Sequence, residues 1–320
     1  MYKIGIIDTM KDKGINLLKN YKDFDCEIVT DLSRENLLLK LPKFDGITLR
    51  RGKIDREILN KCHKLKVIAR HGVGYDSVDT KCLKEKGITL LVAHNSTSTS
   101  PAEHIMFMIM NIYKGVSMFD TMVRSGDFVK AIHLNIEQNF ELFDKTVLIA
   151  GFGRIGKKLI KKCLGFDMKV LVFDPYVDDT TITSLGGTNV SILEEGLKKA
   201  DILSLSLPLN AETKNFITLK EMKLMKKSSI IINAARGGVV NEEDLNNALD
   251  NNIIAFAGID VFEKEPPEPT NPLITNKKVV LSPHSATFTK EGLESMAVET
   301  AQNIIDFFEN KTENTKIVKL

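Results

Sequence analysis

Short apolar runs alternate with amphipathic segments along almost the whole chain, and this alternation constrains the fold more than any other feature. The runs are rich in isoleucine, valine and leucine, as in KIGII at 3–7, TVLIA at 146–150 and SIIINAA at 229–235. Further runs of this kind are CEIV, GITL, KVIA, ITLLV, KVLVF, ILSLSL, IAFAGID and VVLSP. Strands of this type, separated by helices, predict parallel sheets covered on both faces. We therefore expect an α/β fold of the doubly wound class.

The length and the charge of the chain narrow the class further. A chain of 320 residues is long enough for about two domains, each with its own core. A net charge of +2 gives no broad basic field, so neither nucleic acid nor a membrane is an expected partner. The N-terminal residues MYKIGIID enter a strand directly, without the regions of a secretion signal, and the apolar run at 105–113 is too short to cross a bilayer. We expect a cytoplasmic protein.

The four cysteines indicate neither a disulfide framework nor a metal site. Cys26, Cys62, Cys82 and Cys163 are isolated in the sequence, with no pair at the spacing of metal ligands or of a redox motif. We interpret them as reduced, mostly structural thiols, and we expect no bound metal.

One long segment departs from the alternation. Residues 100–128 read as a single, strongly apolar helix that connects two domains, with Ser100 as its cap, Pro101 in its first turn and Glu103 as a favourable first-turn acid. The methionine-rich face at 105–112 is typical of a core or of a subunit interface. Residues 129–145 have no clear periodicity and are expected to form a loop or an arm.

A glycine motif marks a dinucleotide site. Gly151, Gly153 and Gly156 form G-x-G-x-x-G between an apolar strand and a helix, and the next strand ends in Asp174. These positions serve the tight turn, the close approach of the main chain to a pyrophosphate, and the packing of helix on strand. The amides at the helix start can hold phosphates. A carboxylate at Asp174 accepts hydrogen bonds from ribose hydroxyls and repels a 2′-phosphate, which favours NAD over NADP.

Arg236 follows the strand SIIINAA, at the end where ligands gather in a doubly wound sheet. Its planar guanidinium matches a carboxylate and is suited to orienting a 2-oxo acid, and the glycines at 237–238 are expected to leave room for that ligand. The alternative on this segment alone is a structural ion pair with Glu242 or Glu243.

Two further strand ends carry acid–base groups. Asp260 and Glu265 follow one strand, and His284 follows the next. Hydride transfer to a ketone needs a proton donor that works near neutral pH, and histidine supplies one. A carboxylate bonded to the second ring nitrogen would fix the tautomer and favour the protonated form. The combination with Arg236 predicts a dehydrogenase site.

The chain resembles the D-isomer-specific 2-hydroxyacid dehydrogenase family over nearly its whole length. The stretches that carry the likeness are RHGVGYDSVD, NSTSTSPAEH, GFGRIG with Asp174, LSLPLNAETKN, NAARGGVVNEEDL, GIDVFEKEPP and SPHSATFT. The resemblance implies an NAD-dependent oxidoreductase that transfers hydride between nicotinamide and C2 of a 2-hydroxy or 2-oxo acid. It makes Arg236, Glu265 and His284 the catalytic trio.

The resemblance also implies the binding residues. Asp260 would touch the nicotinamide carboxamide, and main-chain amides around Val73 and Gly74 would help to hold the substrate carboxylate. The implied cofactor-binding positions are Gly151, Gly153, Arg154, Ile155, Gly156, Asp174, Ser206, Pro208, Thr213, Ala234 and Asp260. Ser206 and Ser77 depart from residues common in the family, and HSATFT lacks the usual glycine pair after the histidine. None of these departures removes a catalytic group.

The implied layout is discontinuous. Residues 1–98 with 289–320 would form a flavodoxin-like substrate-binding domain, and residues 99–288 would form an NAD-binding Rossmann domain, with the active site in a cleft that closes over the substrate. The family likeness implies a homodimer through the long helix and the arm after it.

Basic residues at strand ends of the first domain suggest the substrate. Arg50, Arg51 and Lys53 follow one strand, and Arg70 ends the next. Phosphoglycerate dehydrogenases carry arginines at positions resembling Arg50 and Arg70, so 3-phosphoglycerate, a serine precursor, is the leading expectation. We do not expect feedback by serine through an appended regulatory domain of the kind that some of those enzymes carry.

Other activities stay open at this point. A hydroxypyruvate or glyoxylate reductase and a D-lactate dehydrogenase fit the same trio. An NAD-sensing corepressor-like protein of the same fold is an alternative from another class, although the sequence lacks partner-recruiting extensions.

Overall fold

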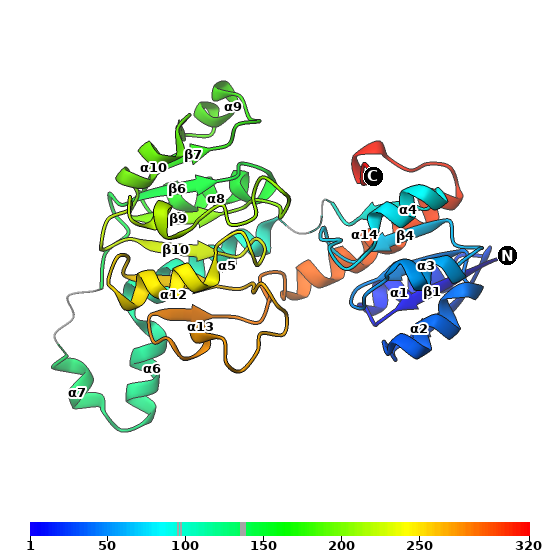
Figure 1. Ribbon diagram of the computed structural model, residues 1–320, viewed down its shortest axis with the longest axis horizontal. Helices are drawn as coiled ribbons and strands as arrows, with labels where there is room; N and C mark the ends of the chain where they lie inside the picture. The colour runs from blue at the N-terminus through cyan, green and yellow to red at the C-terminus, as the bar shows by residue number, and fades with distance from the viewer. Residues whose placement is uncertain (95, 97, 135–138) are drawn as a thin grey trace. The chain divides into compact units, whose positions relative to one another are not determined.

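The computed structural model describes residues 1–94, 96, 98–134 and 139–320. The chain forms two compact units, one of residues 1–97 with 288–320 and one of residues 98–287 (Figure 1). Positions 95 and 97 of the stretch NSTSTSPAEH and positions 135–138 of the expected arm lie outside the described residues. The expected class, an α/β fold with two doubly wound parallel sheets, is confirmed.

The first unit contains a five-stranded parallel sheet of order β2-β1-β3-β4-β5. Its strands are β1 (Tyr2–Ile7), β2 (Phe24–Val29), β3 (Gly46–Leu49), β4 (Val67–Arg70) and β5 (Thr89–Val92). Its helices are α1 (Asp12–Lys19), α2 (Arg34–Lys40), α3 (Arg56–Lys61), α4 (Thr80–Lys86) and α14 (Lys290–Phe308), with short 3₁₀ turns at Leu41–Lys43 and Asn314–Lys316.

Two cores cover the faces of this sheet. One joins the sheet to α1 and α14, and the other joins it to α2, α3 and α4. Helices α1 and α14 approach so closely that a Cβ on Gly14 would lie 2.4 Å from the carbonyl oxygen of Ala297. Strands buried on both faces read as continuous apolar runs, which is how the sequence pattern located β3, β4 and β5, whereas the edge strand β2 is partly exposed.

The second unit contains a seven-stranded parallel sheet of order β12-β11-β10-β9-β6-β7-β8. Its strands are β6 (Thr146–Ala150), β7 (Lys169–Phe173), β8 (Thr188–Asn189), β9 (Ile202–Leu205), β10 (Ile230–Asn233), β11 (Phe256–Ile259) and β12 (Val279–Leu281). The two-residue edge strand β8 was not predicted, because so short a segment carries no periodicity.

The second unit also contains helices (Figure 1). They are α5 (Thr99–Lys114), α6 (Val116–Arg124), α7 (Phe128–Ile132), α8 (Arg154–Leu164), α9 (Asp179–Ser184), α10 (Leu193–Lys199), α11 (Leu219–Met222), α12 (Glu242–Asp250) and α13 (Pro272–Thr275). Among the described residues, no helix is both long and apolar enough to cross a membrane. All four cysteines are free thiols, as expected.

The single helix expected over 100–128 is wrong. Helix α5 ends at Gly115, whose φ of 62° is left-handed, and α6 starts directly after it. The side-chain oxygen of Asn111 accepts hydrogen bonds from the amide and the hydroxyl of Ser117, both at 2.9 Å. A left-handed glycine ends a helix at little cost, and Asn111 satisfies a donor at the start of the next one.

The expected start of the helix is also corrected. The N-cap is Ser98, not Ser100, and Glu103 lies beyond the first turn. Glu103 instead accepts a hydrogen bond of 3.0 Å from Lys162 of α8. Along 105–112, one face of α5 is buried against the sheet, as predicted, while Phe107 and Met110 are exposed.

Candidate active site

The glycine loop lies where the order of the second sheet reverses, between β6 and β9. Gly151 has a φ of 94°, and a Cβ there would lie 2.6 Å from the carbonyl oxygen of Ser206. A Cβ on Gly156 would lie 2.6 Å from the carbonyl oxygen of Gly151, whereas one on Gly153 would meet nothing within 4 Å. Two glycines therefore serve packing, and the third leaves open space for a ligand at the switch point of the sheet.

Helix α8 begins at Arg154, with Ile155 as its second residue, so their amides belong to the helix start where a pyrophosphate binds. Asp174 follows β7, and its two carboxylate oxygens accept hydrogen bonds from the amides of Phe152 at 2.7 Å and Tyr176 at 2.9 Å. These bonds fix the carboxylate beside the glycine loop.

The segment after β9 forms a closed turn. The Thr213 hydroxyl donates to the carbonyl of Pro208 at 2.5 Å and accepts from the amide of Asn210 at 2.9 Å. The amide of Ser206 donates to the carbonyl of Ala150 at 2.8 Å, which ties the turn to the glycine loop. The Ser206 hydroxyl is buried and has no hydrogen-bond partner among the described residues.

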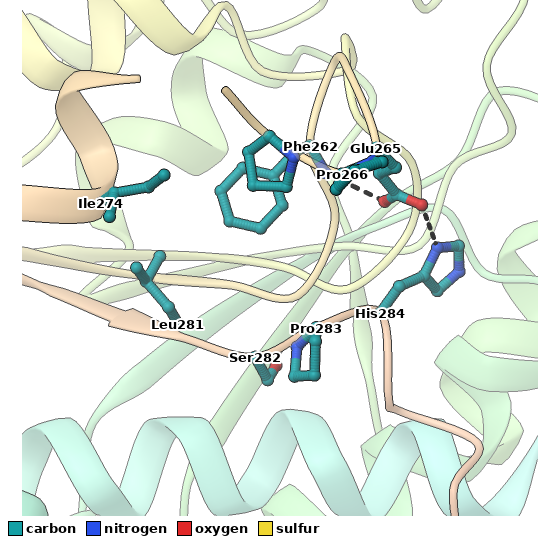
Figure 2. Close-up of a pocket in the computed structure, with 9 residues that line it drawn as sticks. Phe262, Glu265, Pro266, Ile274, Leu281, Ser282, Pro283 and His284 are labelled. Atoms are coloured by element: carbon teal, nitrogen blue, oxygen red, sulfur yellow. Dashed lines mark hydrogen bonds and ion pairs between the residues drawn. The ribbon is translucent and has the colours of Figure 1, made fainter. Parts of the chain in front are cut away.

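Glu265 and His284 form an acid–base pair. The distance between His284 Nδ1 and Glu265 Oε2 is 2.7 Å, and Glu265 Oε1 accepts a bond from the Phe262 amide at 3.1 Å (Figure 2). Burial disfavours the charged form of Glu265. The hydrogen bond and charge of His284, the Phe262 amide and the charge of Arg236 together outweigh burial, so the pKa of Glu265 is lowered. An ionised carboxylate only accepts, so Nδ1 carries the proton and Nε2 is the nitrogen available to a substrate.

A cavity of about 440 Å³ lies beside this pair (Figure 2). Most of its lining is apolar, and the two polar groups of the pair lie at one side of it. The lining residues are Phe262, Glu265, Pro266, Pro267, Ile274, Leu281, Ser282, Pro283 and His284.

Asp260 organises the loop that carries His284. Its side chain is fully buried, and its carboxylate accepts bonds from the Ser282 hydroxyl at 2.5 Å and from the amides of Ser285 at 2.8 Å and Ala286 at 3.0 Å. Burial disfavours the charge, but His104, Ser282 and the two amides lower the pKa below its usual value. A contact between Asp260 and the nicotinamide carboxamide stays a prediction.

The charge of Arg236 is one of the causes that lower the pKa of Glu265. One guanidinium nitrogen donates to the carbonyl of Ala235 at 2.6 Å. Ala234, the cofactor residue expected here, is the first residue after β10 and is half-buried. Glu242, one of the two acids suggested as an alternative partner of Arg236, accepts a bond of 2.6 Å from the Glu263 amide.

Gly237 does not leave room for a ligand, contrary to the expectation. A Cβ at this position would lie 1.8 Å from the carbonyl oxygen of Phe262 and 2.5 Å from the amide nitrogen of Glu263. Main chain meets main chain at this point, so Gly237 holds the segment of Arg236 against the segment that leads to Glu265.

The expected substrate residues of the first unit have their own partners. Arg70 donates from Nε to the carbonyl of Gly74 at 2.7 Å and from Nη1 to the carbonyls of Leu49 at 2.8 Å and Arg50 at 3.1 Å. Arg70 thus holds the loop that contains Val73 and Gly74 against the end of β3.

Arg50 and Arg51 both approach Asp8, a residue that the sequence reading missed. Asp8 is nearly buried, and it bonds to Arg51 Nε at 2.6 Å and lies 3.9 Å from Arg50 Nη1. Arg50 Nη1 also donates to the carbonyl of Thr9 at 3.2 Å. Asp8 directly follows β1, and the two arginines directly follow β3, which pairs with β1 in the sheet. A prediction that these two strands are neighbours would have indicated the ion pair.

Comparison with known proteins agrees with this geometry. The family model "D-isomer specific 2-hydroxyacid dehydrogenase, NAD binding domain" matches residues 106–286. The D-3-phosphoglycerate dehydrogenase of Methanocaldococcus jannaschii is 34% identical over 95% of this chain, although the chain spans only 57% of that relative. The glyoxylate reductase of Pyrococcus furiosus is 33% identical, over 99% of this chain and 95% of its own length.

A solved structure extends the likeness to the full fold. The TT0316 protein from Thermus thermophilus has a TM-score of 0.89 and 28% identity, and the match covers 99% of this chain and 100% of that one. The resemblance seen in the sequence is thus confirmed. The chain belongs to the D-isomer specific 2-hydroxyacid dehydrogenase family.

Proposed function

We propose that the chain is an NAD-dependent D-2-hydroxyacid dehydrogenase. The observation that carries the proposal is the 2.7 Å bond between His284 and Glu265, together with the charge of Arg236, which helps to lower the pKa of the same carboxyl. An acid–base histidine, its anionic partner and a cation for a substrate carboxylate are the groups that reduction of a 2-oxo acid requires.

The residues around the glycine loop fit a dinucleotide. The open space at Gly153 and the amides of Arg154 and Ile155 suit a pyrophosphate, and Asp174 suits the adenosine ribose hydroxyls. A carboxylate there disfavours a 2′-phosphate, so NAD is the proposed cofactor in preference to NADP. When bound, the nicotinamide supplies or accepts the hydride at C2 of the substrate.

The protein side chains handle the charge and the proton. Arg236 binds the substrate carboxylate and orients C2. In reduction, His284 donates a proton from Nε2 to the C2 oxygen, and in oxidation it takes that proton back. Glu265 holds the ring through Nδ1 and stabilises the imidazolium. We assign cofactor binding to residues 99–288 and substrate binding to residues 1–98 with 289–320.

A panel of about ten 2-oxo acids with NADH tests the class of reaction. We expect turnover on the order of 10 per second for at least one acid. His284→Ala should lower kcat by about 1000-fold while NADH still binds, because only the proton donor is lost. NADH binding without turnover of any acid would contradict the proposal and favour an NAD-sensing binding protein.

The first substrate that we propose is 3-phosphoglycerate, oxidised to 3-phosphohydroxypyruvate. Arg50 and Arg70, at neighbouring strand ends, supply cations suited to a phosphate. The measurement is the ratio of kcat/KM for 3-phosphohydroxypyruvate to that for hydroxypyruvate. Arg50→Ala and Arg70→Ala should lower the value for the phosphorylated acid more than that for hydroxypyruvate, by about 10-fold or more for each contact. A wild-type ratio near one would exclude this substrate.

A second candidate is an unphosphorylated acid such as hydroxypyruvate, glyoxylate or pyruvate. Asp8 partly neutralises the charge of Arg50, and Arg70 donates three hydrogen bonds to main-chain carbonyls. Both arginines therefore have less capacity to bind a phosphate. One relative that this chain matches over nearly its full length is named a glyoxylate reductase. In this case Arg70→Ala should impair all 2-oxo acids similarly, because it loosens the loop at Val73 and Gly74.

We also propose a homodimer. Helix α6 has no buried residue, and apolar side chains along α6 and α7 are exposed at Val116, Met118, Val123, Phe128, Val129 and Ile132. Light scattering should give twice the mass of the chain, and charged substitutions at Met118 and Val123 should halve it. A wild-type mass of one chain would refute the dimer.

A further inference from the structure

His104 lies behind the catalytic loop, on helix α5, and the sequence reading assigned it no role. Its Nε2 is 3.0 Å from the Ser282 hydroxyl oxygen and 3.5 Å from Asp260 Oδ1. Its side chain is only 16% exposed. The chain separates His104 from Ser282 by 178 residues, so only the tertiary fold brings them together.

The hydrogen bonds define the state of His104. The Ser282 hydroxyl has one hydrogen, and at 2.5 Å from Asp260 Oδ1 it donates that hydrogen to the carboxylate. The Ser282 oxygen can then only accept from His104. The proton of the neutral ring must therefore be on Nε2, and the bonds run in one direction, from His104 through Ser282 to Asp260.

Asp260 also fixes the backbone of the segment that contains His284. Its carboxylate fixes the amides of Ser285 and Ala286, and its main-chain carbonyl accepts a 2.7 Å bond from the His284 amide. His284 has a φ of 51°, a left-handed conformation that a residue with a side chain keeps only when its surroundings hold it there. Ser282, two residues before His284, and Ser285, directly after it, are therefore held by groups that His104 contacts.

We propose that His104 is a positioning residue, which holds the Ser282–Ala286 segment through Ser282 and Asp260 so that His284 meets Glu265 and the substrate. The inference rests on the proposed function for its kinetic consequences. It adds a residue from α5 to the proposed catalytic groups Arg236, Glu265 and His284, which come from the segments after β10, β11 and β12.

Two variants at one position separate this role from simple packing. His104→Leu fills space without a donor, and His104→Gln restores an N–H within reach of Ser282. For the Leu variant we expect kcat for 2-oxo acid reduction to fall about 10-fold, as for other supporting groups around a reactive centre. KM for the 2-oxo acid should change less than about 3-fold, since Arg236 is untouched. The Gln variant should recover most of kcat.

The pH profile gives a signature that packing alone would not move. A displaced His284 loses part of its bond to Glu265, so its protonated form is less stabilised and reduction should decline at lower pH in His104→Leu than in the wild type. Ser282→Ala should have the same effect, and the double variant should add little, because the two groups act in one series. The matched control is His63→Leu, which changes an exposed histidine of the first unit.

Titration of ¹⁵N-labelled histidines by NMR tests the inference without turnover. The His284 signal should titrate at lower pH in His104→Leu than in the wild type and in His63→Leu. If no acid is turned over but this shift occurs, the proposed function fails and the positioning role stands. Wild-type kcat and wild-type His284 titration in His104→Leu, or equal impairment of the Leu and Gln variants, would overturn the inference.

Discussion

Gly237→Ala tests the most crowded main-chain contact of the site. The new Cβ would lie 1.8 Å from the Phe262 carbonyl oxygen, and such contacts are not found below about 3.0 Å, so one segment must move by about 1.2 Å. Arg236 is adjacent to the change, and Glu265 lies three residues beyond Phe262. A shift of about 1 Å between groups that act together typically costs on the order of 100-fold in rate. We expect a loss of this size in kcat/KM for the 2-oxo acid.

The assay compares kcat/KM with NADH binding and thermal unfolding. NADH binding should persist, because the glycine loop at Gly151 is not displaced, and overpacking should cost about 1–3 kcal/mol of unfolding free energy. Gly165→Ala is the matched control, since a Cβ there meets nothing closer than 3.4 Å. If Gly237→Ala keeps kcat/KM within about 3-fold of the wild type, the contact does not set the distance between Arg236 and Glu265.

Three further predictions concern charge. Asp174→Ala should lower the preference for NAD over NADP by about 10-fold, since one repulsion of about 1.4 kcal/mol is removed; unchanged discrimination in steady-state kinetics would mean that another group reads the ribose. Glu265→Gln removes the anion that supports the imidazolium, so the decline of reduction should move to lower pH; an unchanged pH profile would refute this role. Burial, with the charge of Arg50, lowers the pKa of His71 to about 4. Below about pH 6.5 this histidine is therefore protonated in the unfolded state but stays neutral in the folded state. The free energy of unfolding should fall by about 3 kcal/mol as the pH is lowered from 6.5 to 4. Urea unfolding of His71→Asn should lack this part of the decline, and identical pH dependence would contradict it.

The proposed catalytic groups were foreseeable from sequence because each follows a strand of a parallel sheet. Parallel strands end at the same edge, so Arg236, Glu265 and His284 had to gather there once the strands were recognised. The bond between His284 and Glu265 agrees with that reasoning. The supporting groups were not foreseeable, because His104 lies at the start of an apolar helix and its partners follow 156 and 178 residues later.

By itself the sequence determined the two parallel sheets, the glycine loop and the strand-end groups, because these depend on local periodicity and on residues adjacent in the chain. Tertiary structure decided which glycines serve packing and which leave ligand space, where α5 ends, and whether each arginine holds a loop or faces an anion. The sequence-based prediction for Gly237 was wrong, and that for Arg70 missed its bonds to main-chain carbonyls, for the same reason. Their roles depend on main-chain atoms of distant segments, and a pattern of side chains along the sequence does not encode where those atoms lie.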